Sequence, residues 1–259
     1  MKHLRLISFV IATLLCLPVP AFAQLSSAVY VSPTGTDTGT CPSSAPCATM
    51  QYAATQAAWS AVLYLADGTY NQTLVLVGQR INVMGNSANP GNVIVNGATG
   101  QTVFDAEDLS VLTLNGMLIN APGGIGVHTR QFSVIDYQDI YWGPAIIHVS
   151  AQEHSKINGN GGELIIASAG TYGYHAAAGD HSTVELNGTI TLQSGTSDSF
   201  FLLATDQSTI DCSSANFSGE VSGGYQWNLD QSRVKLPTSG GPIPGFTAGN
   251  NALNYSVEN

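Results

Sequence analysis

Basic residues are scarce in this chain. Lysine and arginine together number only 7, against 17 aspartate and glutamate residues, and the formal net charge is −10. So little positive charge argues against nucleic acids and anionic membranes as partners, because both are recognised chiefly through lysine and arginine. Alternatively, the acidic surface serves only to keep an exported protein soluble.

Long hydrophobic runs are also missing after the first residues. The one extended apolar run, Leu6 to Leu17, follows Lys2 and Arg5 and precedes Ala-Phe-Ala at 21–23. This run is too short to span a bilayer, and the three parts together are typical of a secretory signal peptide. We therefore expect residues 1–23 to be cleaved, and the mature protein to be secreted or periplasmic without membrane insertion.

Cysteine is almost absent. After Cys16 in the predicted signal peptide, the chain holds Cys41, Cys47 and Cys212. Cys41 and Cys47 lie six residues apart in a polar loop of an exported chain, which predicts a local disulfide. No paired Cys or His motif accompanies them, so a zinc site is not expected.

Helical periodicity is rare, and a repeat takes its place. Six short alternating segments each begin with a serine, and these serines are spaced by 23, 22, 27, 26 and 24 residues: Ser110, Ser133, Ser155, Ser182, Ser208 and Ser232. A period in the twenties indicates a solenoid. Because the leucine-rich pattern and the long helices of other solenoids are missing, the repeat predicts stacked β-coils.

The repeat also predicts which side chains fill the interior. In a strand, alternate residues face the same side, so the second and fourth residues after each serine should point inward. The first interior ladder would then be Leu112, Ile135, Ile157, Val184, Ile210 and Val234, and the second Leu114, Tyr137, Leu186, Cys212 and Leu236. Cys212 is therefore predicted to be a buried, unpaired thiol.

The two ends of the chain differ from the repeat. Residues 24–61 read as a strand, the disulfide loop and a helix from Thr49 to Ala61 that caps the open end of coils spanning 62–236. Residues 237–259 are rich in glycine and proline at their start. This trailing loop either covers the last coil or forms a subunit contact, in which case a homotrimer is expected.

The N-terminal motifs resemble those of the pectin-lyase-like, right-handed parallel β-helix superfamily. The matching stretches lie within residues 29–77 and are Tyr30 to Asp37, Gly39-Thr40, Pro46, Thr49 to Ala53 and Leu63 to Tyr70. The resemblance implies an all-β, single-stranded, right-handed parallel β-helix with an N-terminal capping helix. Trp59-Ser60-Ala61 stands where the superfamily usually has Gly-Asp. Since its members include lyases, hydrolases, tail spikes and surface proteins, the resemblance does not fix the function.

The enzymes of this superfamily cut acidic polysaccharides with a basic residue and calcium, or with paired carboxylates. Few basic residues remain after the signal peptide, and the lyase and polygalacturonase motifs are missing. The sequence therefore favours a protein that binds polysaccharide on an elongated face without a recognisable catalytic set. The alternatives are a polysaccharide lyase or glycoside hydrolase with a non-standard site, and a structural envelope or tail-spike-like appendage protein.

Acidic residues recur two positions before the aligned serines. Equivalent residues of neighbouring coils should lie about 5 Å apart, where carboxylates share a proton or bind a cation. Calcium is thus a candidate cofactor, with Asp180, Asp206 and Asp230 as candidate ligands. Alternatively, aspartate is there because turns favour it.

Histidines mark two further positions of the repeat. His154 and His181 each precede an aligned serine and follow an acidic residue, so the candidate catalytic residues are Glu153, His154, Asp180 and His181. Imidazole and carboxylate groups in one place can act as general acid and base. Alternatively, like residues stack in a solenoid only because they pack well.

Aromatic rings near the turns form the last candidate group. An exposed row of rings with flanking polar groups is a common way to hold sugars, which makes the candidate carbohydrate-binding residues Tyr141, Trp142, Tyr172, His148 and His175. Alternatively, some of these rings point inward and belong to the core.

Overall fold

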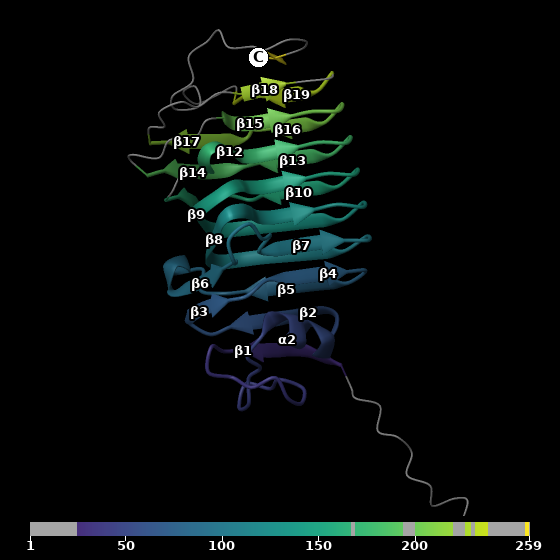
Figure 1. Cartoon of the computed structure of the whole chain (residues 1–259), viewed down its shortest axis with the longest axis vertical. Helices are drawn as coiled ribbons and strands as arrows, with labels where there is room; N and C mark the ends of the chain where they lie inside the picture. Colours follow the sequence, from purple (N-terminus) through teal and green to yellow (C-terminus); the bar gives the residue numbers. More distant parts are fainter. Residues whose placement is uncertain are drawn as a thin grey trace, which may run out of the picture.

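The computed structural model describes residues 25–166, 169–193, 200–219, 226–228, 231–237 and 257–258. The predicted signal peptide and most of the trailing loop lie outside these residues. The described chain forms an all-β parallel solenoid in which strands stack along one long axis (Figure 1). No helix among the described residues is long and apolar enough to cross a membrane.

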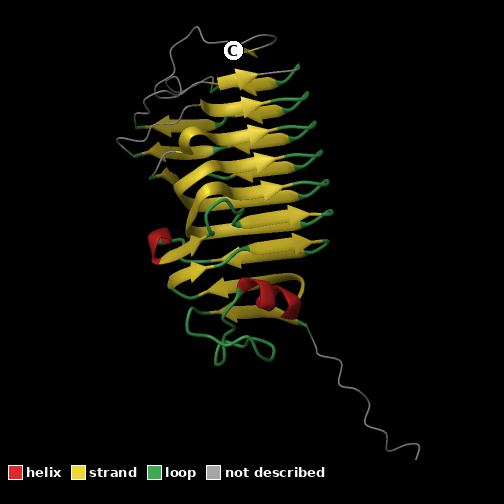
Figure 2. Cartoon of the chain, viewed as in Figure 1, coloured by secondary structure: helices red, strands yellow, loops and turns green. Residues whose placement is uncertain are grey.

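The elements of the described part are strands of 2 to 19 residues, one α-helix and one 3₁₀-helix (Figure 2). The strands are β1 (Ser26–Val31), β2 (Ala57–Leu65), β3 (Gly68–Asn71), β4 (Leu74–Val77), β5 (Arg80–Met84), β6 (Val93–Asn96), β7 (Phe104–Glu107), β8 (Val111–Thr129), β9 (Val134–Ala151), β10 (Lys156–Gly159), β11 (Glu163–Ile165), β12 (Ala169–Ala178), β13 (Thr183–Leu186), β14 (Gly188–Leu192), β15 (Phe200–Ala204), β16 (Thr209–Asp211), β17 (Ala215–Ser218), β18 (Gln226–Asn228), β19 (Arg233–Lys235) and β20 (Val257–Glu258). The helices are α2 (Met50–Gln56) and η1 (Pro90–Asn92).

The interior ladders are confirmed. Ile157 pairs in register with Ile135 on one side and Val184 on the other, and the ladder continues from Leu112 to Val234 with every member buried. In the second ladder Cys212 is buried and unpaired, as predicted, and burial raises the pKa of its thiol. Leu236 is only partly buried.

The aligned serines themselves form a third ladder, which holds neighbouring coils together. The backbone N–H of Ser133 donates to the Oγ of Ser155 at 3.1 Å, and the N–H of Ser155 donates to the Oγ of Ser182 at 3.0 Å. The same bond links Ser110 to Ser133, Ser182 to Ser208 and Ser208 to Ser232. A buried N–H needs an acceptor, and each of these hydroxyls accepts the N–H of the preceding aligned serine. This explains why serine recurs at this position of the repeat.

The helix begins where predicted and ends earlier. Thr49 caps α2, since its side chain accepts the N–H of Tyr52 at 3.1 Å. The prediction of helix up to Ala61 is wrong, because the chain enters β2 at Ala57 and pairs with β1. Pairing with a neighbouring strand thus outweighs the helix propensity of this alanine-rich segment. The capping role of α2, which contacts β1, β2 and β4, stays a prediction.

The loop before α2 is tied down at two points. Cys41 and Cys47 form the predicted disulfide. The Asp37 carboxylate accepts the backbone N–H groups of Ala48 and Thr49, both at 2.9 Å, and the Thr49 hydroxyl at 2.8 Å. These bonds fix the loop against the start of α2.

Candidate functional site

The predicted catalytic residues lie on the turns that precede the aligned serines. Glu153, His154, Asp180 and His181 all have positive φ, between 52° and 63°, and all are exposed. The imidazoles of His154 and His181 stack at 5.0 Å with an interplanar angle of 2°. The structure therefore brings the two histidines together on an exposed edge, and their catalytic role stays a prediction.

The candidate calcium ligands belong to the same turns. Asp180 and Asp206 are exposed, and their backbone carbonyls accept the N–H groups of His154 and His181, both at 2.9 Å. Asp230 lies outside the described residues. Within the described ranges, no group of three or more His, Cys, Asp or Glu side chains is arranged to hold a metal ion. Aspartate tolerates the left-handed conformation of these turns, which explains its recurrence there without a cation.

The prediction of carbohydrate binding is wrong for three of the five residues. Trp142, His148 and His175 are completely buried, so no sugar can stack on them from solvent. Tyr141 is half-buried on β9, between Leu118 and Leu164 of the neighbouring coils. The side chain of Tyr172 lies outside the described ones.

The buried rings surround Glu163. They point inward because its carboxylate contacts their polar groups. Its carboxylate accepts the Tyr137 hydroxyl at 3.1 Å and the Trp142 Nε1–H at 2.9 Å, and lies 3.4 Å from the His175 Nε2. The His148 Nε2 lies 3.0 Å from the carbonyl of Gly143. Such a satisfied polar network can be buried at little cost.

Burial determines the protonation of this network. Desolvation, assisted by the neighbouring His175, lowers the pKa of His148 to about 3, so its imidazole is neutral at physiological pH. Desolvation and then the charge of Glu163 raise the pKa of Tyr137 well above its ordinary value. The network is therefore part of the core rather than a site open to ligands.

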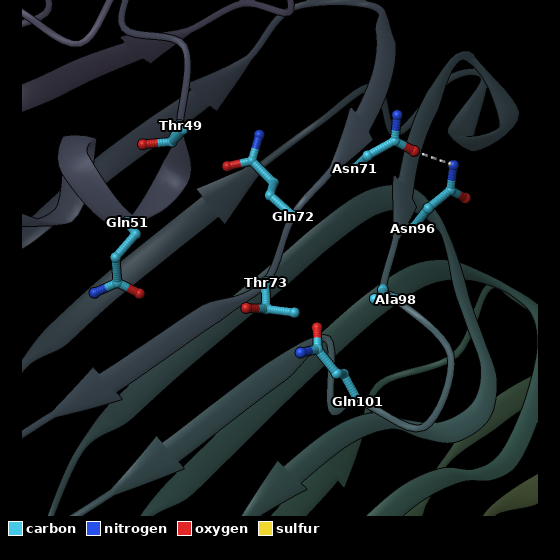
Figure 3. Close-up of a pocket in the computed structure, with 9 residues that line it drawn as sticks. Thr49, Gln51, Asn71, Gln72, Thr73, Asn96, Ala98 and Gln101 are labelled. Carbon is cyan, nitrogen blue, oxygen red and sulfur yellow. Dashed lines mark hydrogen bonds between the residues drawn. The ribbon is translucent and has the colours of Figure 1, made fainter.

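A pocket of about 490 Å³ lies beside α2, at the N-terminal coils (Figure 3). Its walls come from the start of α2, the β3–β4 connection, and the end of β6 with the loop that follows. The lining residues are Thr49, Gln51, Asn71, Gln72, Thr73, Asn96, Gly97, Ala98 and Gln101. None of these side chains titrates, and seven of the nine lining residues carry an amide or a hydroxyl group. Sequence reasoning missed this pocket, because its walls lie far apart in the chain.

A second polar cluster, also missed, lies on the outer face of β7 and β8. The Asp105 Oδ1 is 3.2 Å from the His128 Nδ1, and the Arg130 guanidinium contacts both Asp105, at 3.4 Å, and Glu107. The hydrogen bond to Glu107 raises the pKa of Arg130 above its ordinary value. Although the Asp105–His128 contact is close, it is poorly aligned, and the Asp105 Oδ1, His128 Nε2 and Arg130 Nε are buried without a hydrogen-bond partner among the described residues.

This Asp105 cluster and the pocket share one face of the solenoid. Asp105 pairs in register with His128 on one side and with Val75 on the other. The backbone of Val75 is bonded to the side chain of Gln51, which lines the pocket. The repeat carries a signal for the cluster, since Asp105 and His128 each lie five residues before an aligned serine.

Neither a protein-family model nor a curated protein sequence matches the chain. Among solved structures, the crystal structure of Escherichia coli YbhC is similar, with 10% sequence identity and a TM-score of 0.48. The similarity covers 85% of this chain and 74% of that chain.

Proposed function

We propose that this protein is exported and binds a polysaccharide on its outer face, with the pocket beside α2 as the main binding site. The observation that carries the proposal is a pocket in which seven of the nine lining residues carry an amide or a hydroxyl group and none carries a charge. Such groups both donate and accept hydrogen bonds, as sugar hydroxyls do. The Cys41–Cys47 disulfide supports export, because disulfides persist in oxidising compartments.

A binding screen tests the proposal. The purified chain without residues 1–23 is titrated with a panel of neutral and acidic polysaccharides, alongside Gln101→Ala and the control Gln138→Ala. Gln138 is also exposed but lies on β9, away from the pocket. We expect at least one polysaccharide to bind, and Gln101→Ala alone to weaken that binding. No binding by any member of the panel would refute the proposal.

A second candidate function is hydrolysis of the bound chain by the Asp105 cluster. It is favoured by the Asp105 Oδ1 and the His128 Nε2, which are buried without a hydrogen bond to any described residue, since such atoms in a native protein call for a ligand, a water or a catalytic role. Asp105 would hold the His128 imidazole. His128 would take a proton from the attacking water as general base and return it to the leaving sugar oxygen, so that one water is added across the glycosidic bond.

Product assays test this second function. Wild-type protein is incubated with the same panel, and new reducing ends and ultraviolet absorbance are followed. We expect reducing ends that disappear in Asp105→Asn and His128→Gln and persist in His154→Gln. Loss of activity in His154→Gln alone would instead place the chemistry on the exposed turns, and no product with the wild type would leave binding only.

A further inference from the structure

Most polar side chains of the pocket are already bound to the fold. The Gln51 side chain donates to the carbonyl of Val75 at 3.2 Å and accepts its N–H at 3.0 Å, as a neighbouring strand would. The Gln72 side chain accepts the N–H of Met50 at 2.7 Å and donates to the carbonyl of Ala48 at 3.3 Å. These two amides attach α2 to the coils, so they have little left for a ligand.

Three asparagines of successive coils are hydrogen-bonded in a row of amides that ends in the pocket. The Nδ2 of Asn120 donates to Asn96 at 2.7 Å, and the Nδ2 of Asn96 donates to the Oδ1 of Asn71 at 2.9 Å (Figure 3). Asn71 is the last member and is exposed. Its own Nδ2 makes no hydrogen bond to any residue that the structure describes. This row of amides therefore holds the Asn71 side chain in place and leaves its Nδ2 group able to donate to a ligand.

Two more side chains of the pocket have polar groups that the fold does not use. Neither the Thr73 hydroxyl nor the Gln101 amide bonds to another described residue. Thr73 lies in the connection between β3 and β4, just after Asn71, and Gln101 lies in the loop between β6 and β7. Together with Asn71 they offer donors and acceptors but no charge.

The residues that line the pocket carry no charge. One lining residue, Thr49, donates its hydroxyl to the Asp37 carboxylate, which places a negative charge next to the pocket. No lysine or arginine lines the pocket, and the whole chain carries a net charge of −10. A carboxylate ligand would lose its water there and gain no cation, which is unfavourable.

We propose that the pocket selects a neutral, hydroxyl-rich sugar over a uronate, and that Asn71, Thr73 and Gln101 are the residues that contact it. This inference rests on the proposed polysaccharide binding and adds the ligand class and the contacts. A sugar hydroxyl can both donate to and accept from these side chains, whereas a carboxylate only accepts, so the Gln101 oxygen would find no donor on it.

The test is calorimetric titration with two kinds of probe: neutral oligosaccharides of glucan, xylan and galactan, and oligogalacturonate with and without calcium. We expect a neutral probe to bind, with an affinity that changes by less than about twofold between 50 and 500 mM salt, because no ion pair is made. Gln101→Ala and Asn71→Asp should each weaken binding by about 5- to 10-fold, the usual loss for one hydrogen bond. Asn71→Asp keeps the size of the side chain and removes its donor.

Gln138→Ala is the matched control and should leave the affinity unchanged, and the thermal midpoint of each variant checks that it is folded. Tighter binding of oligogalacturonate than of every neutral probe would overturn the neutral selectivity while leaving polysaccharide binding intact. Binding of a neutral probe that none of the pocket variants weakens would overturn the assigned contacts. No binding of either probe would overturn the proposed function itself.

Discussion

The coils after Ser110 and the coils before it differ in regularity. From Ser110 onward, successive serines bond to one another across separations of 22 to 27 residues. In the preceding coil the equivalent donor is not a serine: the N–H of Gln79, 31 residues earlier, donates to the Ser110 hydroxyl. The regular coils end in tight turns whose side chains form an exposed edge, whereas the irregular coils carry the loops that line the pocket. We infer that the repeat supplies the scaffold and that its interruptions supply the site.

The largest expected effect comes from breaking the interior ladder of the regular coils. Ile157→Ala should lower the free energy of unfolding by about 2–5 kcal/mol, because the side chain is fully buried between Ile135 and Val184. Ile146, which is 43% exposed on β9, provides a matched control, and Ile146→Ala should cost about 0.5 kcal/mol or less. Urea unfolding of both variants measures the difference, and equal losses would contradict the assigned register.

The buried network makes the regular coils sensitive to acid. His148 is neutral in the folded state down to pH about 3, whereas an unfolded histidine takes up a proton below its ordinary pKa of 6.5. Stability from this group is therefore complete above pH 6.5 and falls as the pH drops toward 3.

The amount lost between pH 7 and pH 5 should be about 2 kcal/mol for His148. His148→Gln, which keeps a donor and does not titrate, should lose correspondingly less over the same range. Urea unfolding at the two pH values measures both losses, and an equal acid sensitivity of the variant and the wild type would show that His148 is not buried in its neutral form.

The pocket contains two kinds of glutamine, which stability measurements should separate. Gln72→Ala removes the acceptor for the Met50 N–H at the start of α2 and should cost about 1–3 kcal/mol. Gln101→Ala should change stability by less than about 0.5 kcal/mol, because Gln101 is exposed and its amide holds no other described residue. If the two losses were reversed, Gln101 would be a structural residue and not a ligand contact.

The smallest expected effect concerns the turns. Leu109 adopts a left-handed conformation with φ 64° and is 70% exposed. Leu109→Gly should therefore raise the free energy of unfolding by about 1 kcal/mol or slightly less, since glycine reaches this conformation without strain. Thermal unfolding measures the gain, and a loss of stability would mean that the leucine side chain makes a contact that its exposure hides.

The sequence predicted the scaffold better than the site. The spacing of the serines was enough to give the register, the interior ladders and the burial of Cys212, because a solenoid repeats one local pattern. It did not reveal that Ala57 leaves the helix for a strand, which depends on pairing with β1.

The errors at the candidate site have a common physical cause. Trp142 and His148 resembled surface residues because they are polar or aromatic and lie near turns. The fold can bury both rings because Glu163 accepts the Trp142 N–H and the His148 Nε2 lies 3.0 Å from the Gly143 carbonyl. The pocket could not be predicted either. Gln51 and Gln101 both line it, and they come together only because of the way two irregular loops run in the folded chain. Periodicity carries no information about such loops.

Hydrogen exchange with and without a saturating neutral oligosaccharide compares the two regions in one measurement and shows which of them binds. We expect the ligand to slow exchange in peptides covering 49–51, 71–73 and 96–101 and to leave the turns at 131–132, 153–154 and 180–181 unchanged. Protection of those turns, with none around the pocket, would place binding on the regular edge and contradict this expectation.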